Sequence, residues 1–108
     1  MPPEAKGTHA MLAYVINDME VLDAALLEDY KKLSAPTVAQ YGGRFLARGG
    51  KVDRLEGDWQ PRRLVIIEFA SAAQAHAWID SPEYAGAKLI RQRASRSNLI
   101  VVEGAAPP

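Results

Sequence analysis

The feature that most constrains this fold is a set of runs in which consecutive residues are apolar. One run lies within Arg63–Phe69, and two others lie within residues 11–16 and 99–102. Each has the length of a β-strand and is rich in Val, Ile and Leu. A strand with one face in water normally alternates apolar and polar residues, which these runs do not. We therefore expect a sheet that is covered on both faces.

The first half of the chain is predicted to form a strand and a helix. We place the strand at residues 9–17, ended by Asn17 and Asp18. Pro36 is expected either to break the helix near Ser34 or to kink it before it resumes, and Gly42-Gly43 supplies its left-handed stop. The apolar stripe of this helix is predicted to comprise Leu22, Leu26, Tyr30 and Leu33.

The middle of the chain reads as two strands joined by a long connection. A short strand is expected at Arg44–Arg48, followed by a tight turn at Gly49-Gly50. Residues 51–56 are interpreted as a short returning arm or irregular edge, and residues 57–62 as a loop. Arg63–Phe69 is then the most apolar strand of the chain.

The last third carries two helix starts and a final strand. Ser71 to Gln74 has the pattern of a capping box, and the helix is expected to bury Ala75, Trp78 and Ile79. Ser81-Pro82-Glu83 combines an N-cap, a Pro at the first helical position and an early acid, which indicates a second start. The final strand is predicted at residues 97–103.

The resulting order is β-α-β-β-α-β, which is the ferredoxin-like α+β arrangement with a four-stranded antiparallel sheet and helices on one face. A chain of 108 residues has single-domain size. We place the domain at residues 9–104, between flexible tails at 1–8 and 105–108. The helices leave one apolar sheet face open, and we expect a second copy to cover it as a two-fold homodimer. The alternative is a monomer whose loops fold over the sheet.

Composition excludes several classes of protein. Thirteen basic and thirteen acidic residues give no net charge, so the basic excess of a nucleic-acid-binding protein is missing. The absence of cysteine excludes disulfides and thiolate metal sites. The N-terminus lacks the apolar core of a signal peptide, and no apolar run reaches the ~18 residues of a membrane helix. We therefore expect a cytoplasmic protein with no nucleic-acid or membrane partner.

Several short motifs occur in a distinctive order over residues 10–104. They are Tyr41-Gly42-Gly43-Arg44, Ala47-Arg48-Gly49-Gly50, Leu55-Glu56-Gly57, Arg63 with Val65–Phe69, and Ser81-Pro82-Glu83-Tyr84. With this set the chain resembles the DUF1330 proteins, a bacterial family of unknown function. The resemblance implies the dimeric α+β barrel superfamily, whose members include cofactor-free monooxygenases, lactone isomerases, decarboxylases and haem proteins. So broad a range of activities supplies no single reaction.

Glu68 is the most distinctive candidate for chemistry, because it lies within an apolar strand. Such a carboxylate must be paired, solvated or carried with an altered pKa, and a buried base suits proton abstraction. The alternative is an ion pair with Arg44 or Arg48. Those two arginines are predicted to share one face of their strand, flanking Leu46, where Arg48 could hold a substrate carboxylate or enolate.

Four tyrosines could line a cleft between sheet and helices, and Tyr30 and Tyr14 are the candidates to contact a ligand. Core packing is the alternative for each. His76 is expected to be exposed on its helix, and isolated histidines give no metal-ligand spacing, so no metal site is expected. Trp59 is a loop anchor, a dimer contact or a pocket lid, and we favour the contact.

These observations favour a small homodimer that binds a carboxylated or enolisable organic molecule without a cofactor. If it is an enzyme of the isomerase or monooxygenase type, Glu68 would be base or acid, Arg48 the anion holder and Tyr30 a hydrogen-bond donor. Arg44 and Tyr14 are further ligand-binding candidates. A non-catalytic ligand-binding or stress-related dimer is the main alternative, and a haem protein using His76 is a third.

Overall fold

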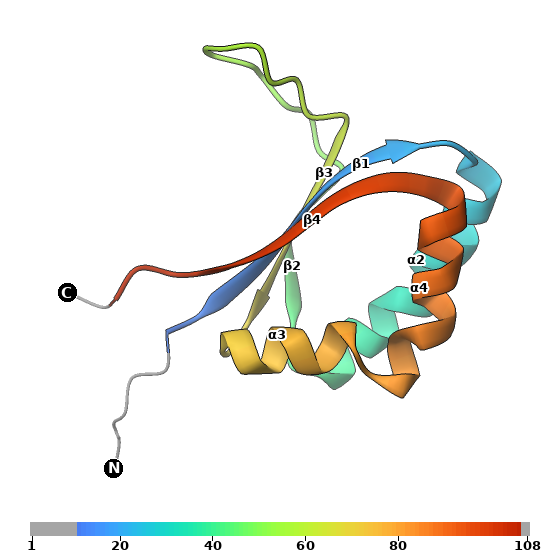
Figure 1. Ribbon diagram of the computed structural model, residues 1–108, viewed down its shortest axis with the longest axis vertical. Coiled ribbons are helices and arrows are strands. Elements are labelled where there is room, and N and C mark those ends of the chain that lie inside the picture. Colours follow the sequence, from blue (N-terminus) through green and yellow to red (C-terminus); the bar gives the residue numbers. More distant parts are fainter. Residues whose placement is uncertain (1–10, 107–108) are drawn as a thin grey trace.

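The computed structural model describes residues 11–106, which form one antiparallel sheet with helices on one face (Figure 1). Four strands lie in the order β2-β3-β1-β4, and each neighbouring pair is antiparallel. This confirms the predicted ferredoxin-like arrangement. The predicted N-terminal tail and the first residues of the first strand lie outside the described residues. Within residues 11–106, no helix combines the length and apolar character needed to cross a membrane.

Strand β1 spans Ala13–Val21 and continues four residues beyond the predicted end at Asn17. Ala13, Val15, Asn17 and Met19 face the helices and are buried, while the alternate side chains face away. The prediction that Asn17 and Asp18 end the strand was therefore wrong. The backbone stays paired on both sides, with β3 and with β4, so a polar side chain does not interrupt it.

Helix α2 spans Ala24–Gln40 and begins where the Asp23 carboxylate accepts a hydrogen bond from the Leu26 backbone N–H at 3.0 Å. It continues through Pro36 without a break. It ends at Gln40, and Gly42 just beyond it has a φ of 76°, as the Gly-Gly stop predicts. The Gly43 N–H then donates to the Val38 carbonyl at 2.9 Å.

The predicted stripe of α2 was half right, because Leu26 and Tyr30 pack against the core. Leu22 precedes the helix, and both Leu22 and Leu33 are about half exposed. The helix rotates so that small polar side chains reach the interior, where Thr37 accepts a hydrogen bond from the Trp78 indole at 3.0 Å. Its buried residues are Leu27, Ser34, Thr37 and Val38.

Strand β2 spans Arg44–Arg48, as predicted, but carries a β-bulge. Phe45 lies opposite Ile67 and Ala47 opposite Ile66, so two steps along β2 match one step along β3. Leu46 is therefore an extra residue. Because side chains alternate with a period of two, one extra residue exchanges the faces of all positions that follow it.

A loop of residues 49–62 connects β2 to β3 and projects beyond the sheet (Figure 1). The predicted returning arm at 51–56 pairs with no strand. The loop is fastened to β1 near its end instead. Asp18 accepts hydrogen bonds from the Trp59 indole at 2.9 Å and from the Arg62 backbone N–H at 3.0 Å.

The remaining elements follow the predicted order: strand β3 (Arg63–Phe69), helix α3 (Ala72–Ile79), helix α4 (Pro82–Ala94) and strand β4 (Ser95–Glu103). Ser71 and Ser81 accept hydrogen bonds as N-caps from Gln74 and Tyr84. The capping box of α3 is half formed, because the Gln74 side chain donates to the Tyr41 carbonyl rather than back to Ser71.

The core lies between the helices and the inner face of the sheet, which is the face that the helices cover. Phe69, Trp78 and Tyr84 stack through it, with ring centroids 5.6 Å apart for the first pair and 4.2 Å for the second. The outer face carries Ile16, Leu64, Ile66, Ile100 and Val102 and has no helix over it. The fold therefore presents two chemically different faces of one sheet.

Candidate functional site

A small cavity lies between the inner face of the sheet and helices α2 and α4. Its apolar walls include Val15, Val65, Ile67, Trp78 and Leu99. The free volume of the cavity is about 20 Å³, which is room for about one water molecule. A larger ligand therefore requires side chains at the mouth to move.

Three arginines from three elements line this cavity: Arg48 of β2, Arg63 of β3 and Arg91 of α4. Within residues 11–106 none of them forms an ion pair with a carboxylate. A buried charge without a partner is costly, so such a group is expected to have a ligand. The cavity is thus lined by an excess of positive charge.

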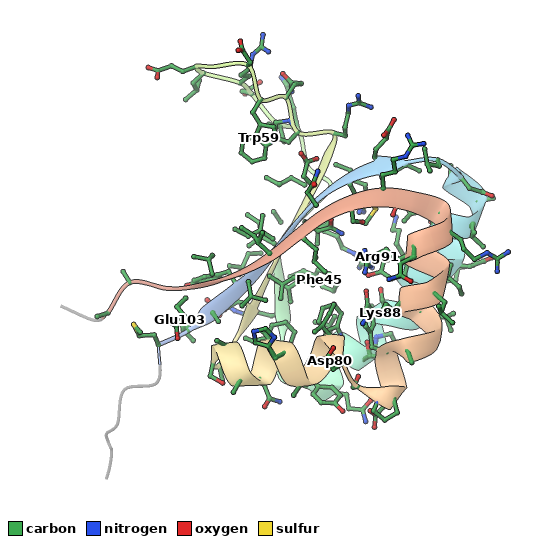
Figure 2. The ribbon with its side chains drawn as sticks, viewed as in Figure 1. Phe45, Trp59, Asp80, Lys88, Arg91 and Glu103 are labelled. Atoms are coloured by element: carbon green, nitrogen blue, oxygen red, sulfur yellow. The ribbon has the colours of Figure 1, made fainter. Side chains whose placement is uncertain are left out.

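Arg91 is the most deeply placed of the three. It is 6% exposed, and it points from α4 into the space between helix and sheet (Figure 2). Its Nε donates to the Tyr84 hydroxyl oxygen at 3.1 Å, which is a neutral acceptor. That hydrogen bond orients the guanidinium group but leaves its charge uncompensated.

Arg48 and Arg63 lie closer to solvent. The Arg48 guanidinium packs over the Phe45 ring, 4.3 Å from its centroid, and Nη2 donates to the Lys31 carbonyl oxygen at 3.3 Å. This contact links the sheet edge to α2 across the mouth of the cavity. Burial lowers the pKa of Arg63, and the nearby positive charge of Arg48 lowers it further. Both effects favour an anion beside these groups.

Two tyrosines continue the polar wall. The hydroxyls of Tyr30 and Tyr84 lie 2.9 Å apart. Since Arg91 can only donate, the Tyr84 oxygen accepts from it and the Tyr84 proton is available to Tyr30. Burial, with the neighbouring Tyr84 hydroxyl, raises the pKa of Tyr30. Tyr30 is therefore a neutral hydrogen-bond donor at ordinary pH.

Asn17 completes the polar lining from the sheet side. It is 5% exposed, and no donor among residues 11–106 reaches its Oδ1. Cross-strand pairing places it opposite Val65 on β3 and Leu99 on β4. An unpaired amide oxygen in a cavity wall is unusual, because most buried polar atoms have partners.

The candidate residues named from the sequence divide between the two faces of the sheet. Tyr30 and Arg48 line the cavity. Glu68, Arg44 and Tyr14 form a cross-strand row on the outer face, where Arg44 Nε donates to a Glu68 oxygen at 2.8 Å. Grouping Glu68 with Arg48 and Tyr30 in one cleft was therefore wrong.

The bulge at Leu46 explains this division. The sequence predicts one face for Arg44 and Arg48, but the extra residue between them turns Arg48 inward, opposite Val65. Arg44 stays on the outer face and pairs with Glu68. The carboxylate thus has the arginine partner that was the alternative to a catalytic role.

His76 and Trp59 lie away from the cavity. His76 is exposed on α3 and borders a shallow apolar groove with Ile79 and Leu99. Trp59 lies over the end of the outer face and is 63% exposed, with its indole bound to Asp18 (Figure 2). The described part of the chain brings no three His, Cys, Asp or Glu side chains into a metal-binding cluster.

The sequence interpretation missed Arg91, Arg63 and Asn17. A signal existed for Arg91, because Tyr84, Ala87, Arg91 and Ala94 follow helical spacing and make one buried stripe. A basic residue is also favoured near a helix C-terminus, which gives the pattern a second explanation. No comparable pattern marks Arg63, which begins a strand next to another arginine.

The fold and cavity together define a class: a small ferredoxin-like α+β protein with a cation-lined cavity between sheet and helices. The chain belongs to the family described as "Domain of unknown function (DUF1330)", which matches residues 12–105. No match was found among curated proteins.

Solved structures share the fold at low sequence identity. The RPA0582 protein of unknown function from Rhodopseudomonas palustris aligns with a TM-score of 0.72 and 23% identity, covering 90% of this chain and 85% of that one. SnoaB, a cofactor-independent oxygenase from Streptomyces nogalater, gives 0.65 and 16%, covering 91% and 97%. A proposed antibiotic biosynthesis monooxygenase from Nitrosomonas europaea gives 0.55 and 15%, covering 94% and 97%. At these identities the comparisons establish the fold alone.

Proposed function

We propose that this protein binds a small organic anion, a carboxylate or an enolate, in the cavity between sheet and helices. The observation that carries the proposal is the group of three arginines that face one cavity without a carboxylate partner among residues 11–106. Guanidinium groups bind planar carboxylates in bidentate fashion, and they do so more strongly in apolar surroundings.

A purely structural role explains the arginines less well. Removing a guanidinium group from water costs on the order of several kcal/mol per ion, unless a charge partner replaces the lost hydration. Arg91 is almost fully buried, and within the described part of the chain its side chain has only a hydroxyl partner. A structural network would have placed a carboxylate nearby, as the outer face does for Arg44. An incoming anion supplies the partner that the inner face lacks.

The same arrangement suits an enolate, whose negative charge three guanidinium groups would stabilise. Among residues 11–106, no Asp, Glu or His lines the cavity. The site therefore favours binding and charge stabilisation over proton abstraction by a carboxylate or imidazole. SnoaB, which shares this fold, is described as a cofactor-independent oxygenase. An oxygenase reaction on an enolisable acid is therefore the first activity to assay, by following oxygen consumption.

The binding test compares small acids with their amides. Acetate, propionate and benzoate are titrated calorimetrically against acetamide, propionamide and benzamide at constant ionic strength. We expect the acids to bind at least about tenfold more tightly than the matched amides, because only the acids neutralise the arginines. Equal binding of acids and amides, or no binding of either, would overturn the proposal.

A matched pair of variants locates the binding. Arg91→Met removes the buried guanidinium and should weaken acid binding about tenfold or more. Arg93→Met makes the same change two residues further along α4, where the side chain is exposed, and should leave affinity within about twofold. A similar loss in both variants would place the anion outside the cavity.

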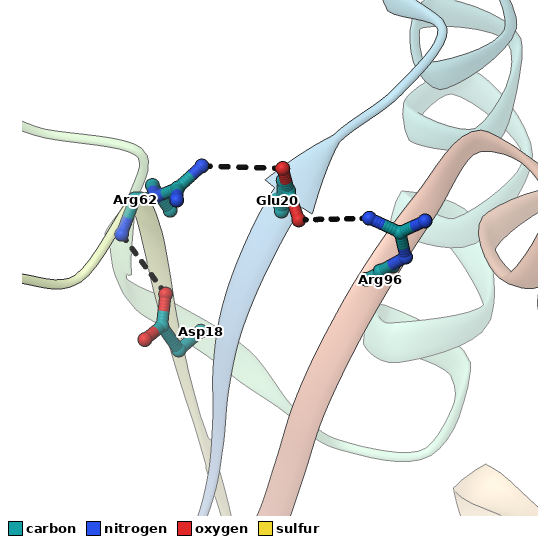
Figure 3. A network of polar contacts seen from close by, with 4 residues as sticks. All are labelled: Asp18, Glu20, Arg62 and Arg96. Carbon is teal, nitrogen blue, oxygen red and sulfur yellow. Dashed lines mark hydrogen bonds and ion pairs between the residues drawn. The ribbon is translucent and has the colours of Figure 1, made fainter.

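We also propose that the outer face joins two copies into a homodimer. Ile100 is 57% exposed and Leu46 and Val102 are nearly half exposed, although they lie beside half-buried Ile16 and Ile66. Charged groups bound this apolar band at both ends: Arg44 with Glu68, and the network of Asp18, Glu20, Arg62 and Arg96 shown in Figure 3. An apolar centre with a polar rim is the usual anatomy of a stable interface.

Light scattering after size exclusion measures the oligomeric state. We expect twice the 11.8 kDa chain mass for the wild type and the single-chain mass for Ile100→Asp, whose charge would be buried between the sheets. Leu89→Asp is the control, since Leu89 is 63% exposed on α4, on the helical side. A monomeric wild type at micromolar concentration would contradict the dimer.

A further inference from the structure

We infer that the ligand of the cavity is a small hydroxy acid, whose hydroxyl group is recognised by Asn17 while its carboxylate is held by the arginines. This inference rests on the proposed anion binding and adds the ligand class. It starts from an amide that the anion proposal leaves unexplained. Asn17 is 5% exposed, lines the same cavity as the three arginines, and has an Oδ1 that no donor among residues 11–106 reaches.

The strand register places Asn17 beside the arginines. Arg48 and Asn17 both pair with Val65, from the strands on either side of it, so all three side chains point to the inner face in one row. Neighbouring strands are about 4.8 Å apart, which puts the two backbones about 10 Å apart. Arg63 lies opposite Met19, diagonally across from Asn17. A compact ligand can therefore contact Asn17 at one end and a guanidinium group at the other.

The positive charge of the cavity wall decides which ligand group can donate a hydrogen bond to Asn17. Oδ1 accepts a hydrogen bond, which an ammonium or a hydroxyl group of the ligand could donate. An ammonium group would lie beside Arg48, Arg63 and Arg91, and like charges repel strongly where water is scarce. A hydroxyl group adds no charge. It also pairs equally well with either end of the amide, because it both donates and accepts.

Access and size fit a ligand of a few carbon atoms. The wall leaves room for about one water molecule while Arg48 spans the mouth. Arg48 is exposed, and a single hydrogen bond of 3.3 Å holds it to the Lys31 carbonyl. A carboxylate is a stronger partner for the guanidinium group than that carbonyl. We expect an acid at the mouth to draw Arg48 away from α2 and to occupy the space it leaves.

Three acids with one carbon skeleton test the inference: lactate, propionate and alanine, which differ only in a hydroxyl group, a hydrogen or an ammonium group. Each is titrated calorimetrically into the full-length protein at one ionic strength. We expect lactate to bind about tenfold more tightly than propionate, and alanine to bind most weakly. A site that hydrogen-bonds a hydroxyl group rejects the analogue without it, because its own polar atom is left unpaired.

Asn17→Leu tests the assigned residue, since leucine keeps the approximate shape but removes both amide groups. It should equalise lactate and propionate while propionate affinity stays within about threefold of the wild type. The control is Asn98→Leu, the same change on the outer face of β4, which should keep the preference for lactate. Circular dichroism verifies that both variants are folded, and the wild-type titrations decide the ligand class without either of them.

The outcomes separate this inference from the proposed function. Tight binding of lactate that Asn17→Leu reduces to the level of propionate supports both. Equal binding of lactate and propionate by the wild type, as expected if a water molecule satisfies Asn17, overturns the hydroxy acid and leaves anion binding intact. A preference for lactate that persists in Asn17→Leu also overturns it. Failure of every acid to bind overturns both.

Discussion

The two faces of this sheet use the same residue in opposite ways. On the outer face, Arg44, Arg62 and Arg96 each form an ion pair with a glutamate, at 2.8 Å, 3.2 Å and 3.5 Å. On the inner face, Arg48, Arg63 and Arg91 line a cavity, and none has a carboxylate partner among residues 11–106. Under the proposed function, the paired arginines serve the fold and the inner ones bind a ligand.

The difference between the two sets of arginines is informative because exposed and buried charges differ in their contact with water. Exposed arginines need no partner because water solvates them, and their ion pairs contribute little to stability. Arg91 is nearly buried and does need a partner, and a chain selected only for stability would place an apolar side chain there. Selection for stability alone would pair a buried arginine before an exposed one, and this sheet does the opposite. The charge of Arg91 lies where an unpaired charge is most costly, which is typical of binding sites.

The largest change in stability should come from truncating an apolar side chain of the inner face, compared with one of the outer face. Trp78→Ala removes a 2% exposed side chain that stacks on Phe69 and Tyr84, and should lower the free energy of unfolding by about 3–5 kcal/mol. Ile100→Ala on the outer face should cost less than about 1 kcal/mol in dilute solution. Urea denaturation followed by circular dichroism measures both. In the proposed dimer, the cost of Ile100→Ala grows with protein concentration, and a cost independent of concentration would argue against that interface.

An intermediate effect is expected when an arginine of each face is replaced. Without ligand, Arg91→Met should raise the free energy of unfolding by about 1–4 kcal/mol, because an apolar side chain replaces an unpaired buried charge. Arg44→Met breaks an exposed ion pair and should change stability by less than about 1 kcal/mol. Thermal denaturation of the two variants beside the wild type tests the comparison. A strongly destabilised Arg91→Met would mean that the inner arginine supports the fold.

The smallest effect concerns the ionisation of Tyr30. Burial raises its pKa, so the folded state holds this proton more tightly than the unfolded state does. The stability that follows is complete below the ordinary tyrosine value of about 10 and is lost as the pH rises above it. Absorbance titration at alkaline pH should therefore give the same tyrosinate signal near pH ~10 for the folded wild type and Tyr30→Phe. A deficit of one tyrosinate in the variant would show that Tyr30 ionises normally.

Sequence reasoning predicted the framework because the framework follows local rules. Ser81-Pro82-Glu83 begins α4, Gly42 ends α2 with a positive φ, and Arg63–Phe69 forms a strand. Each of these depends on residues within one turn or strand. The element order that they fix was sufficient to identify the fold.

The candidate site was predicted only in part, because it depends on which way side chains point. Tyr30 and Arg48 were named and do line the cavity, whereas Glu68 lies on the other face, paired with Arg44. Asn17 was taken for the end of a strand, since an amide seldom lies on a buried face. Arg91 was not named, although its spacing from Tyr84 places it on the buried stripe of α4.

The bulge at Leu46 has a consequence for the comparison of relatives. Residues before the bulge occupy one frame of the strand and residues after it occupy the other, so β2 delivers Arg44 outward and Arg48 inward. A strand with the same number of residues but no bulge would carry both arginines on one face, while its sequence still reads as an arginine-rich strand. Gly49 follows the bulge and Gly43 precedes it. When relatives are compared, the number of residues between an arginine and Gly49 is therefore a better guide to its face than its alignment with Gly43. Loss of the bulge would thus remove Arg48 from the cavity wall without any change in residue types.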